Sequence, residues 1–289
     1  MSGQFITHDV WKRYGATTAL AGVTLSFGRG LNVIVGPNGS GKSTLIRVMT
    51  GFARPDKGRA ESLGLDPWER REELLKSIGV YVEGALLPWW MTGIDVLRLY
   101  SKRWNIPWSQ VREKASLLGV DSYWDKTIRS YSMGMRKKLG LLMALANASE
   151  ALVLDEPYTL LDAPSIKAVD GEIARASRDM PVIVASHLAT EALRAPDTVA
   201  VLYGGRVVAV GDKSGVEGDY VCSARDLWSL IRELADLEPR IESLEYRGGR
   251  LYISLEGRLP QIEMAAECRR SLHRLLYYER LIGGNDEGQ

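Results

Sequence analysis

A run of nine residues near the N-terminus has the types and spacing needed to hold the phosphates of a nucleotide. It contains the pattern G-x-x-x-x-G-K-[ST], in which successive backbone N–H groups of a glycine-rich turn converge on a small concavity and bind phosphate oxygens. We expect Lys42 to reach the β- and γ-phosphates and the Ser43 hydroxyl to bind Mg²⁺. The nine residues are Gly36, Pro37, Asn38, Gly39, Ser40, Gly41, Lys42, Ser43 and Thr44.

The segments on either side of this loop have the structure that the motif requires. Residues 31–35 form a short, β-branched apolar run typical of a buried strand, and residues 45–49 have helical character up to Gly51. We expect any side chain larger than hydrogen at glycines 36, 39 or 41 to block the approach of a phosphate. The strand, loop and helix together favour a phosphate-binding loop over an ordinary glycine turn.

Two adjacent carboxylates, Asp155 and Glu156, follow a second apolar run at residues 151–154. This run predicts a buried parallel strand, and ligands bind at the carboxyl ends of such strands in open α/β sheets. We expect Asp155 to hold Mg²⁺ and Glu156 to orient the water that attacks the γ-phosphate. A similar apolar run at 182–186 is followed by His187. Because we expect this histidine to lie next to the nucleotide, contact with the γ-phosphate is favoured over a structural role.

The remaining segments predict the elements that must position these groups. Strand-like runs at 7–14, 20–27 and 31–35 indicate a β-rich N-terminal layer, and a strand at 78–83 ends on Glu83. Apolar residues recur at spacings of three and four from 95 to 147, which predicts a helical insertion whose last helix is capped by Ser132. A closing hairpin is expected over 198–210.

Two apolar features permit more than one interpretation. Tyr14 is either a ring on which adenine stacks or a strand-end tyrosine packed on the core. Residues 85–91, which begin with Ala85 and end with Met91, form a proline-broken apolar segment. This segment is either an exposed loop that a partner covers or a loop folded onto its own subdomain.

The composition limits the class of protein. At 289 residues with 45% hydrophobic and 25% charged residues, the chain has room for about two globular domains. A net charge of +1 gives no electrostatic argument for nucleic acid as a partner. Cys222 and Cys268 lack metal-ligand spacing, which indicates a reducing compartment. We expect a cytoplasmic chain, since it has neither a membrane-spanning apolar run nor a signal peptide.

In type and order these motifs resemble those of the ATP-binding subunit of ABC transporters, over residues 4–213. Tyr14 matches the family's adenine-stacking aromatic, the loop 36–44 its Walker A motif, and Ser132 and Gly134 stand in its signature at 131–135. Residues 152–156 match Walker B with the catalytic glutamate, and His187 matches the switch histidine.

The resemblance implies a fold and a mechanism. The fold is α/β: a P-loop NTPase core with an N-terminal antiparallel β layer, a helical subdomain at about 85–147, and a cassette spanning 1–215. Two cassettes would dimerise head to tail around two ATP molecules, with Mg²⁺ held by Ser43, Glu83 and Asp155. They would drive a separate membrane permease that docks at 85–91 on the inner face of the cell membrane, in the branch of drug and polysaccharide exporters.

Three positions depart from the family pattern. Glu83 stands at the position of the Q-loop glutamine, and Leu160 stands at a glycine position of the D-loop. Met133 stands two residues after the first position of the signature. A weakly hydrolysing half of a heterodimer is therefore an alternative. A soluble ATP-switched clamp acting on nucleic acid or ribosomes is another, which the neutral charge disfavours.

Residues 216–289 lie beyond the cassette and predict a small α+β appendage. Apolar spacing indicates a helix at 227–234, a strand at 251–255 and a last helix at 265–275, with a disordered end at 283–289. Nothing in this part resembles a ligand motif, so packing or subunit contact is its expected role.

Overall fold

A six-stranded sheet forms the centre of the computed structural model, which describes residues 4–84, 87–186, 196–212, 220–222, 241–247, 250–255 and 268–270. The strand order is β5-β6-β7-β3-β8-β9, and only the β8–β9 pair is antiparallel. Every residue of β3, β6 and β7 is buried, as expected for apolar runs covered on both faces. The strands are β3 Gly30–Val35, β5 Ile78–Tyr81, β6 Ala151–Asp155, β7 Pro181–Ser186, β8 Thr198–Tyr203 and β9 Arg206–Asp212.

An antiparallel three-stranded sheet covers one side of this core and confirms the predicted N-terminal layer for the runs 7–14 and 20–27. The run 31–35 lies instead in the central sheet, as β3. The order of the three-stranded sheet is β2-β1-β4, from β1 Phe5–Tyr14, β2 Thr17–Phe27 and β4 Lys57–Ser62. Helix α1 Lys42–Met49 contributes buried residues to the hydrophobic core shared with this sheet. The strand β4 was not predicted, because four of its six residues are exposed and its sequence, KGRAES, lacks an apolar alternation.

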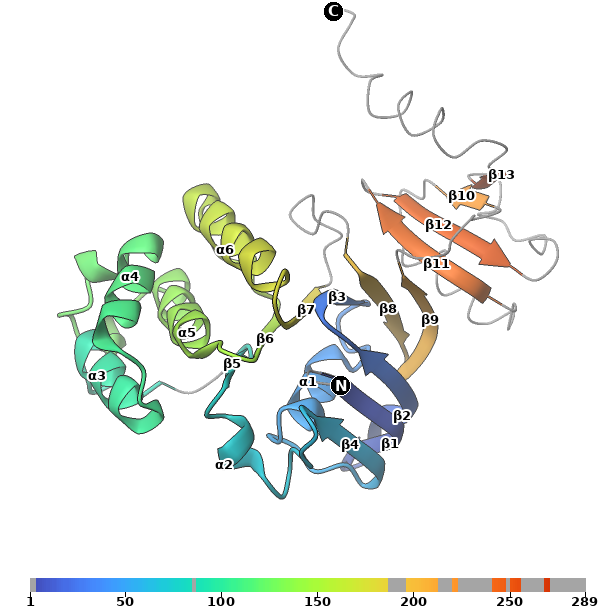
Figure 1. Ribbon diagram of the computed structural model, residues 1–289, viewed down its shortest axis with the longest axis horizontal. Coiled ribbons are helices and arrows are strands. Elements are labelled where there is room, and N and C mark those ends of the chain that lie inside the picture. The colour runs from blue at the N-terminus through green and yellow to red at the C-terminus, as the bar shows by residue number, and fades with distance from the viewer. Residues whose placement is uncertain are drawn as a thin grey trace, which may run out of the picture.

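The helical insertion predicted between β5 and β6 is present on the other side of the sheet (Figure 1). It contains α3 Gly93–Trp104, α4 Trp108–Leu118 and α5 Met133–Asn147, with two short 3₁₀ turns, Val120–Ser122 and Ile128–Ser130. Helix α5 packs closely on β5, because a Cβ at Gly79 would lie 2.0 Å from the Ala144 carbonyl oxygen. The remaining helices are α2 Arg71–Leu74 and α6 Ala163–Ala176.

The predicted hairpin over 198–210 is confirmed as β8 and β9. Beyond it lies a four-stranded antiparallel sheet of order β11-β12-β10-β13, from β10 Tyr220–Cys222, β11 Ile241–Arg247, β12 Arg250–Leu255 and β13 Cys268–Arg270. The strand predicted at 251–255 is therefore confirmed.

The helix predicted over 265–275 is wrong at residues 268–270, which form β13. These residues pair with β10, so that Cys268 lies opposite Cys222. A spacing of three and four in a short segment cannot distinguish a helix from an edge strand, and the pairing partner is remote in the sequence. The helix predicted at 227–234 and the end at 283–289 lie outside the described residues. Across the described ranges, no helix combines the length and apolar character that crossing a membrane requires.

Candidate active site

The loop 36–44 connects β3 to α1 and needs glycine for two different reasons. A Cβ at Gly36 would lie 2.3 Å from the Leu202 carbonyl oxygen, and one at Gly41 would lie 2.4 Å from the Ala19 carbonyl oxygen. These two glycines are therefore required by the chain's own backbone, a reason that the sequence did not predict. Gly39 has φ 81° and faces open space, so the concavity of the loop is accessible at that position.

Lys42 is the first residue of α1 and links the loop to the end of β6. Its Nζ donates hydrogen bonds to the carbonyl oxygens of Gly36 at 2.8 Å and Pro37 at 3.1 Å. The same Nζ lies 3.5 Å from Glu156 Oε1. Burial lowers the pKa of the Lys42 ammonium, and the neighbouring carboxylates of Glu156 and Asp155 oppose this shift.

Asp155 ends β6 and is completely buried. Neither of its carboxylate oxygens receives a well-formed hydrogen bond from the part of the chain that the structure describes. Burial raises the pKa of this carboxyl, and the charges of Glu156 and Glu83 add to the effect, whereas the nearby Ser43 hydroxyl opposes it. Buried carboxylate oxygens beside a serine hydroxyl are suitable ligands for a divalent cation.

Glu156 has its backbone fixed in a left-handed conformation, with φ 51°. Its N–H donates to the Ala185 carbonyl oxygen on β7 at 2.8 Å. Its carbonyl oxygen accepts from the Lys137 ammonium and, at 3.2 Å, from Thr159 Oγ1. We did not predict a role for Lys137, because three consecutive basic residues at 136–138 resemble a solvated helix face in the sequence.

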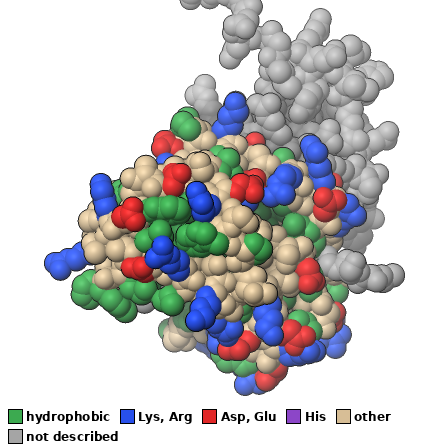
Figure 2. All heavy atoms as spheres, turned by 60° about the vertical axis from the view of Figure 1, so that its left-hand side comes forward, with side chains coloured by type: hydrophobic (Ala, Val, Ile, Leu, Met, Phe, Trp, Pro, Cys, Tyr) green, Lys and Arg blue, Asp and Glu red, His purple; other side chains and the backbone are tan. Residues whose placement is uncertain are grey.

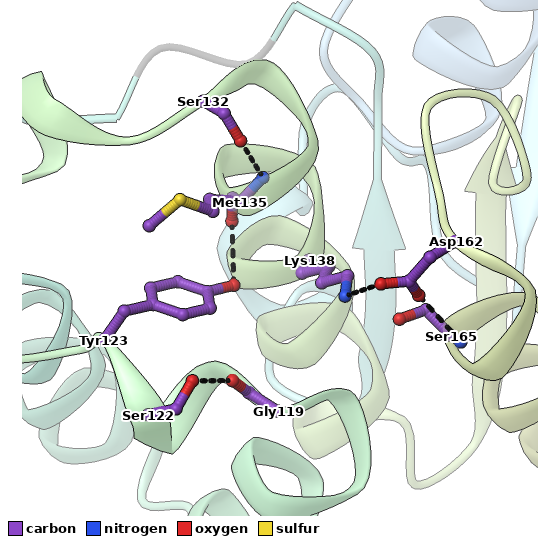
Figure 3. A network of polar contacts seen from close by, with 8 residues as sticks. All are labelled: Gly119, Ser122, Tyr123, Ser132, Met135, Lys138, Asp162 and Ser165. Carbon is purple, nitrogen blue, oxygen red and sulfur yellow. Dashed lines mark hydrogen bonds and ion pairs between the residues drawn. The ribbon is translucent and has the colours of Figure 1, made fainter.

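The N-terminus of α5 is held by a network of polar contacts (Figure 3). Ser132 is the N-cap, as predicted, and its Oγ accepts a hydrogen bond from the Met135 N–H at 3.2 Å. Lys138 on the next turn donates to Asp162, the N-cap of α6, at 2.8 Å. This contact contributes most to lowering the pKa of the Asp162 carboxyl to about 2. The start of α5 is thereby tied to the segment that follows Glu156.

Gly134, in the same segment, is required for a steric reason. A Cβ at Gly134 would lie 2.9 Å from the Leu160 carbonyl oxygen, so α5 and the segment after Glu156 approach closely there. Leu160 itself adopts φ 61°, a conformation that favours glycine, and its side chain is 57% exposed. Leu160 therefore adopts the left-handed backbone conformation that glycine would adopt at this position.

The remaining predicted site residues are exposed or lie outside the described residues. Tyr14 is exposed at the end of β1, with Lys12 Nζ 5.6 Å from the centroid of its ring. Glu83 is exposed just beyond β5, and its charge acts on Asp155. His187 lies outside the described residues. No group of three or more His, Cys, Asp or Glu side chains within the described ranges is arranged to hold a metal ion.

An apolar surface lies beside the cluster, in the segment 85–91 for which the sequence permitted either an exposed loop or one folded onto its own subdomain. Leu87 and Met91 pack against the hydrophobic core. Trp89 and Trp90 are 57% and 66% exposed, whereas Ala85 and Leu86 lie outside the described residues. Hydrophobic side chains gather among lysines and arginines on the face that carries the helical insertion (Figure 2). Trp89 also borders a cavity of about 400 Å³, whose lining includes Glu83, Leu87, Arg129, Lys137 and Leu160.

Comparisons with known proteins relate the chain to one family. The model of a family described as ABC transporter matches residues 20–159. The daunorubicin/doxorubicin resistance ATP-binding protein DrrA of Streptomyces peucetius is 34% identical over 71% of this chain and 64% of that protein, so the chain spans just under two thirds of this relative. The daunorubicin resistance ATP-binding protein DrrA3 of Streptomyces coeruleorubidus is 31% identical over 82% of this chain and 76% of that protein. A dimeric bacterial ABC transporter cassette has a TM-score of 0.63 at 20% identity, covering 73% of this chain and all of that chain.

Proposed function

Because the chain belongs to the ABC transporter family of ATP-binding proteins, we propose that it hydrolyses ATP to drive a separate membrane permease. One observation carries this proposal. Lys42 Nζ lies 3.5 Å from Glu156 Oε1, next to a buried Asp155, at the carboxyl ends of parallel strands. A cation for phosphates, a carboxylate for a metal and a carboxylate for water thus meet at one edge of the sheet.

Each group has a distinct role in hydrolysis. Lys42 binds the β- and γ-phosphates, and the backbone N–H groups of the loop 36–44 bind the remaining phosphate oxygens. Ser43 and Asp155 hold Mg²⁺, with Glu83 as a further candidate ligand. When bound, this ion neutralises charge on the phosphates. Glu156 accepts a hydrogen bond from the attacking water and orients it toward the γ-phosphate.

Four further residues complete the nucleotide site. Tyr14 offers an exposed ring on which adenine stacks. His187 follows β7, which pairs in parallel with both β3 and β6, and contacts the γ-phosphate. Ser132 and Gly134 stand at the start of a fifteen-residue helix, whose N-terminus favours an anion. They close over the ATP bound by a second cassette.

The second cassette and the permease are the expected partners. The permease contacts the apolar surface around Trp89 and Trp90 at the inner face of the membrane, which removes these side chains from water. Both Streptomyces relatives are named for resistance to a drug. Export is the direction of transport that fits resistance. Residues 1–215 form the cassette, and 216–289 form an appendage that makes packing or subunit contacts.

Trapping the dimer tests this proposal. Glu156→Gln keeps the shape of the side chain but cannot orient water for hydrolysis, so bound ATP should hold two copies together. We expect light scattering to report a dimer for this variant in Mg²⁺ and ATP, and a monomer without nucleotide. Glu150→Gln is the matched control, because Glu150 is exposed just before the opposite end of β6. A Glu156→Gln variant that stays monomeric with ATP would contradict self-association.

A further inference from the structure

Lys137 is a buried cation that the reaction described above does not use. Only 4% of this residue is exposed, although it lies between two other basic residues on α5. Its Nζ donates to the Glu156 carbonyl oxygen and to Thr159 Oγ1, and it lies 5.6 Å from the centroid of the Tyr81 ring. An ammonium is costly to bury, and this one is compensated by two oxygens and an aromatic face.

These contacts fix the backbone that carries the proposed catalytic carboxylate. Glu156 holds φ 51°, a left-handed conformation that is unfavourable for a residue with a side chain. The peptide groups on its two sides are held by two different elements. The Ala185 carbonyl on β7 accepts from the Glu156 N–H, and Lys137 donates to the Glu156 carbonyl. The turn that aims the Glu156 side chain toward Lys42 is therefore set from β7 and from α5 together.

The position of Lys137 on α5 is itself fixed by close packing. One turn further along this helix, a Cβ at Gly140 would lie 2.7 Å from Cε2 of Tyr81. Because glycine leaves this space, the Tyr81 ring lies against the helix beside the Lys137 side chain. The same helix begins at Ser132 and Gly134, so its N-terminal segment is connected to the Glu156 backbone through Lys137.

We propose that Lys137 is a positioning residue for ATP hydrolysis, which holds the backbone of Glu156 and Thr159 and makes the orientation of the Glu156 carboxylate depend on the position of α5. A shift of α5 when its N-terminus meets the second nucleotide then moves the Glu156 carbonyl through the Lys137 ammonium. This inference rests on the proposed role of Glu156 in hydrolysis.

Lys137→Met tests the inference, because methionine keeps most of the side-chain volume and removes the donor. We expect kcat for ATP to fall by about 10- to 100-fold, the range for losing a charged hydrogen bond, while the Kd for ATP stays within about twofold. Lys137→Arg should recover part of kcat. The matched control is Lys114→Met, which removes a lysine that is 2% exposed and paired with Glu172 on α6 at 3.0 Å. This control should lose stability without losing kcat.

Outcomes that overturn the inference differ from those that overturn the proposed function. Unchanged kcat in Lys137→Met, or an equal loss of kcat in Lys114→Met, would show that Lys137 has no specific effect on hydrolysis. Unchanged kcat in Glu156→Gln would instead remove the proposed function of Glu156.

Two further measurements complete the test: Thr159→Val leaves Lys137 in place, and amide hydrogen exchange needs no turnover. Thr159→Val removes the hydroxyl at nearly constant volume, and we expect it to lower kcat by less than Lys137→Met does, since the Glu156 carbonyl keeps its charged donor. Amide hydrogen exchange in 156–162 should become faster in Lys137→Met than in the wild type and stay unchanged in Lys114→Met. Unchanged exchange in this segment would overturn the inference even if the purified chain does not hydrolyse ATP.

Discussion

Replacing Asp155 by asparagine should make the folded chain more stable in the absence of Mg²⁺ while it abolishes hydrolysis. The carboxylate is completely buried, its oxygens lack well-formed hydrogen bonds from the described residues, and the charge of Glu156 lies nearby. Lys42 and the Ser43 hydroxyl lie nearby, but burial has the larger effect on Asp155, so removing its charge should raise the free energy of unfolding by about 1–3 kcal/mol. For a chain of this size, such a change corresponds to an increase in Tm of about 2–12 °C.

The effect of pH has a definite sign. Burial raises the pKa of the Asp155 carboxyl in the folded chain above its ordinary value of 3.8. As the pH rises from 3.8 toward the folded pKa, the unfolded chain releases its proton first, and this ionisation destabilises the wild type. The advantage of Asp155→Asn should therefore be absent at lower pH, grow through this window and stay constant above the folded pKa.

Thermal unfolding of both proteins, in EDTA and in Mg²⁺ with ATP, provides the assay. A ligand at 100 times its Kd stabilises the folded state by about 2.7 kcal/mol, and the wild type should gain more of this stabilisation because it retains the metal ligand. In Mg²⁺ with ATP, the difference in Tm between Asp155→Asn and the wild type should therefore become smaller or change sign. Asp179→Asn, at an 82% exposed carboxylate, is the control. A lower Tm for Asp155→Asn in EDTA would refute the reasoning, since it would make Asp155 a stabilising part of the fold.

Three further substitutions have expected outcomes. Lys42→Ala should abolish ATP binding, because it removes the buried cation of the loop; unchanged affinity in a fluorescence titration would contradict the assignment. Gly36→Ala should lower the free energy of unfolding in urea by about 1–3 kcal/mol, since its Cβ would meet a backbone carbonyl at 2.3 Å, whereas Gly171→Ala, in open space on α6, should not. Trp89→Ala combined with Trp90→Ala should preserve ATP binding but prevent assembly with the permease, and retained assembly on co-purification would exclude docking there.

The core of the site could be predicted from the sequence because its signals are local. The strand before Lys42, the loop itself and the run that ends at Asp155 each lie within a few consecutive residues. Parallel strands bring their carboxyl ends to one edge, so the meeting of Lys42, Asp155 and Glu156 follows from the order of these runs.

Other features depend on contacts between distant parts of the chain and have no local signal. The burial of Lys137 is compensated by the Glu156 carbonyl and Thr159, which follow it in the turn after β6. Gly36 is required because a side chain there would meet a carbonyl on β8, far along the sequence. The strand β13 depends on pairing with β10, and its short apolar pattern also fits a helix.

The most direct test of the central claim is steady-state ATP hydrolysis by the purified chain at increasing protein concentration, with wild type beside Glu156→Gln. We predict that activity rises faster than linearly with concentration, because two chains must close around ATP, and that it is lost in the variant. Activity that is strictly linear in protein, or that persists in Glu156→Gln, would contradict an ATPase that works as a dimer through Glu156.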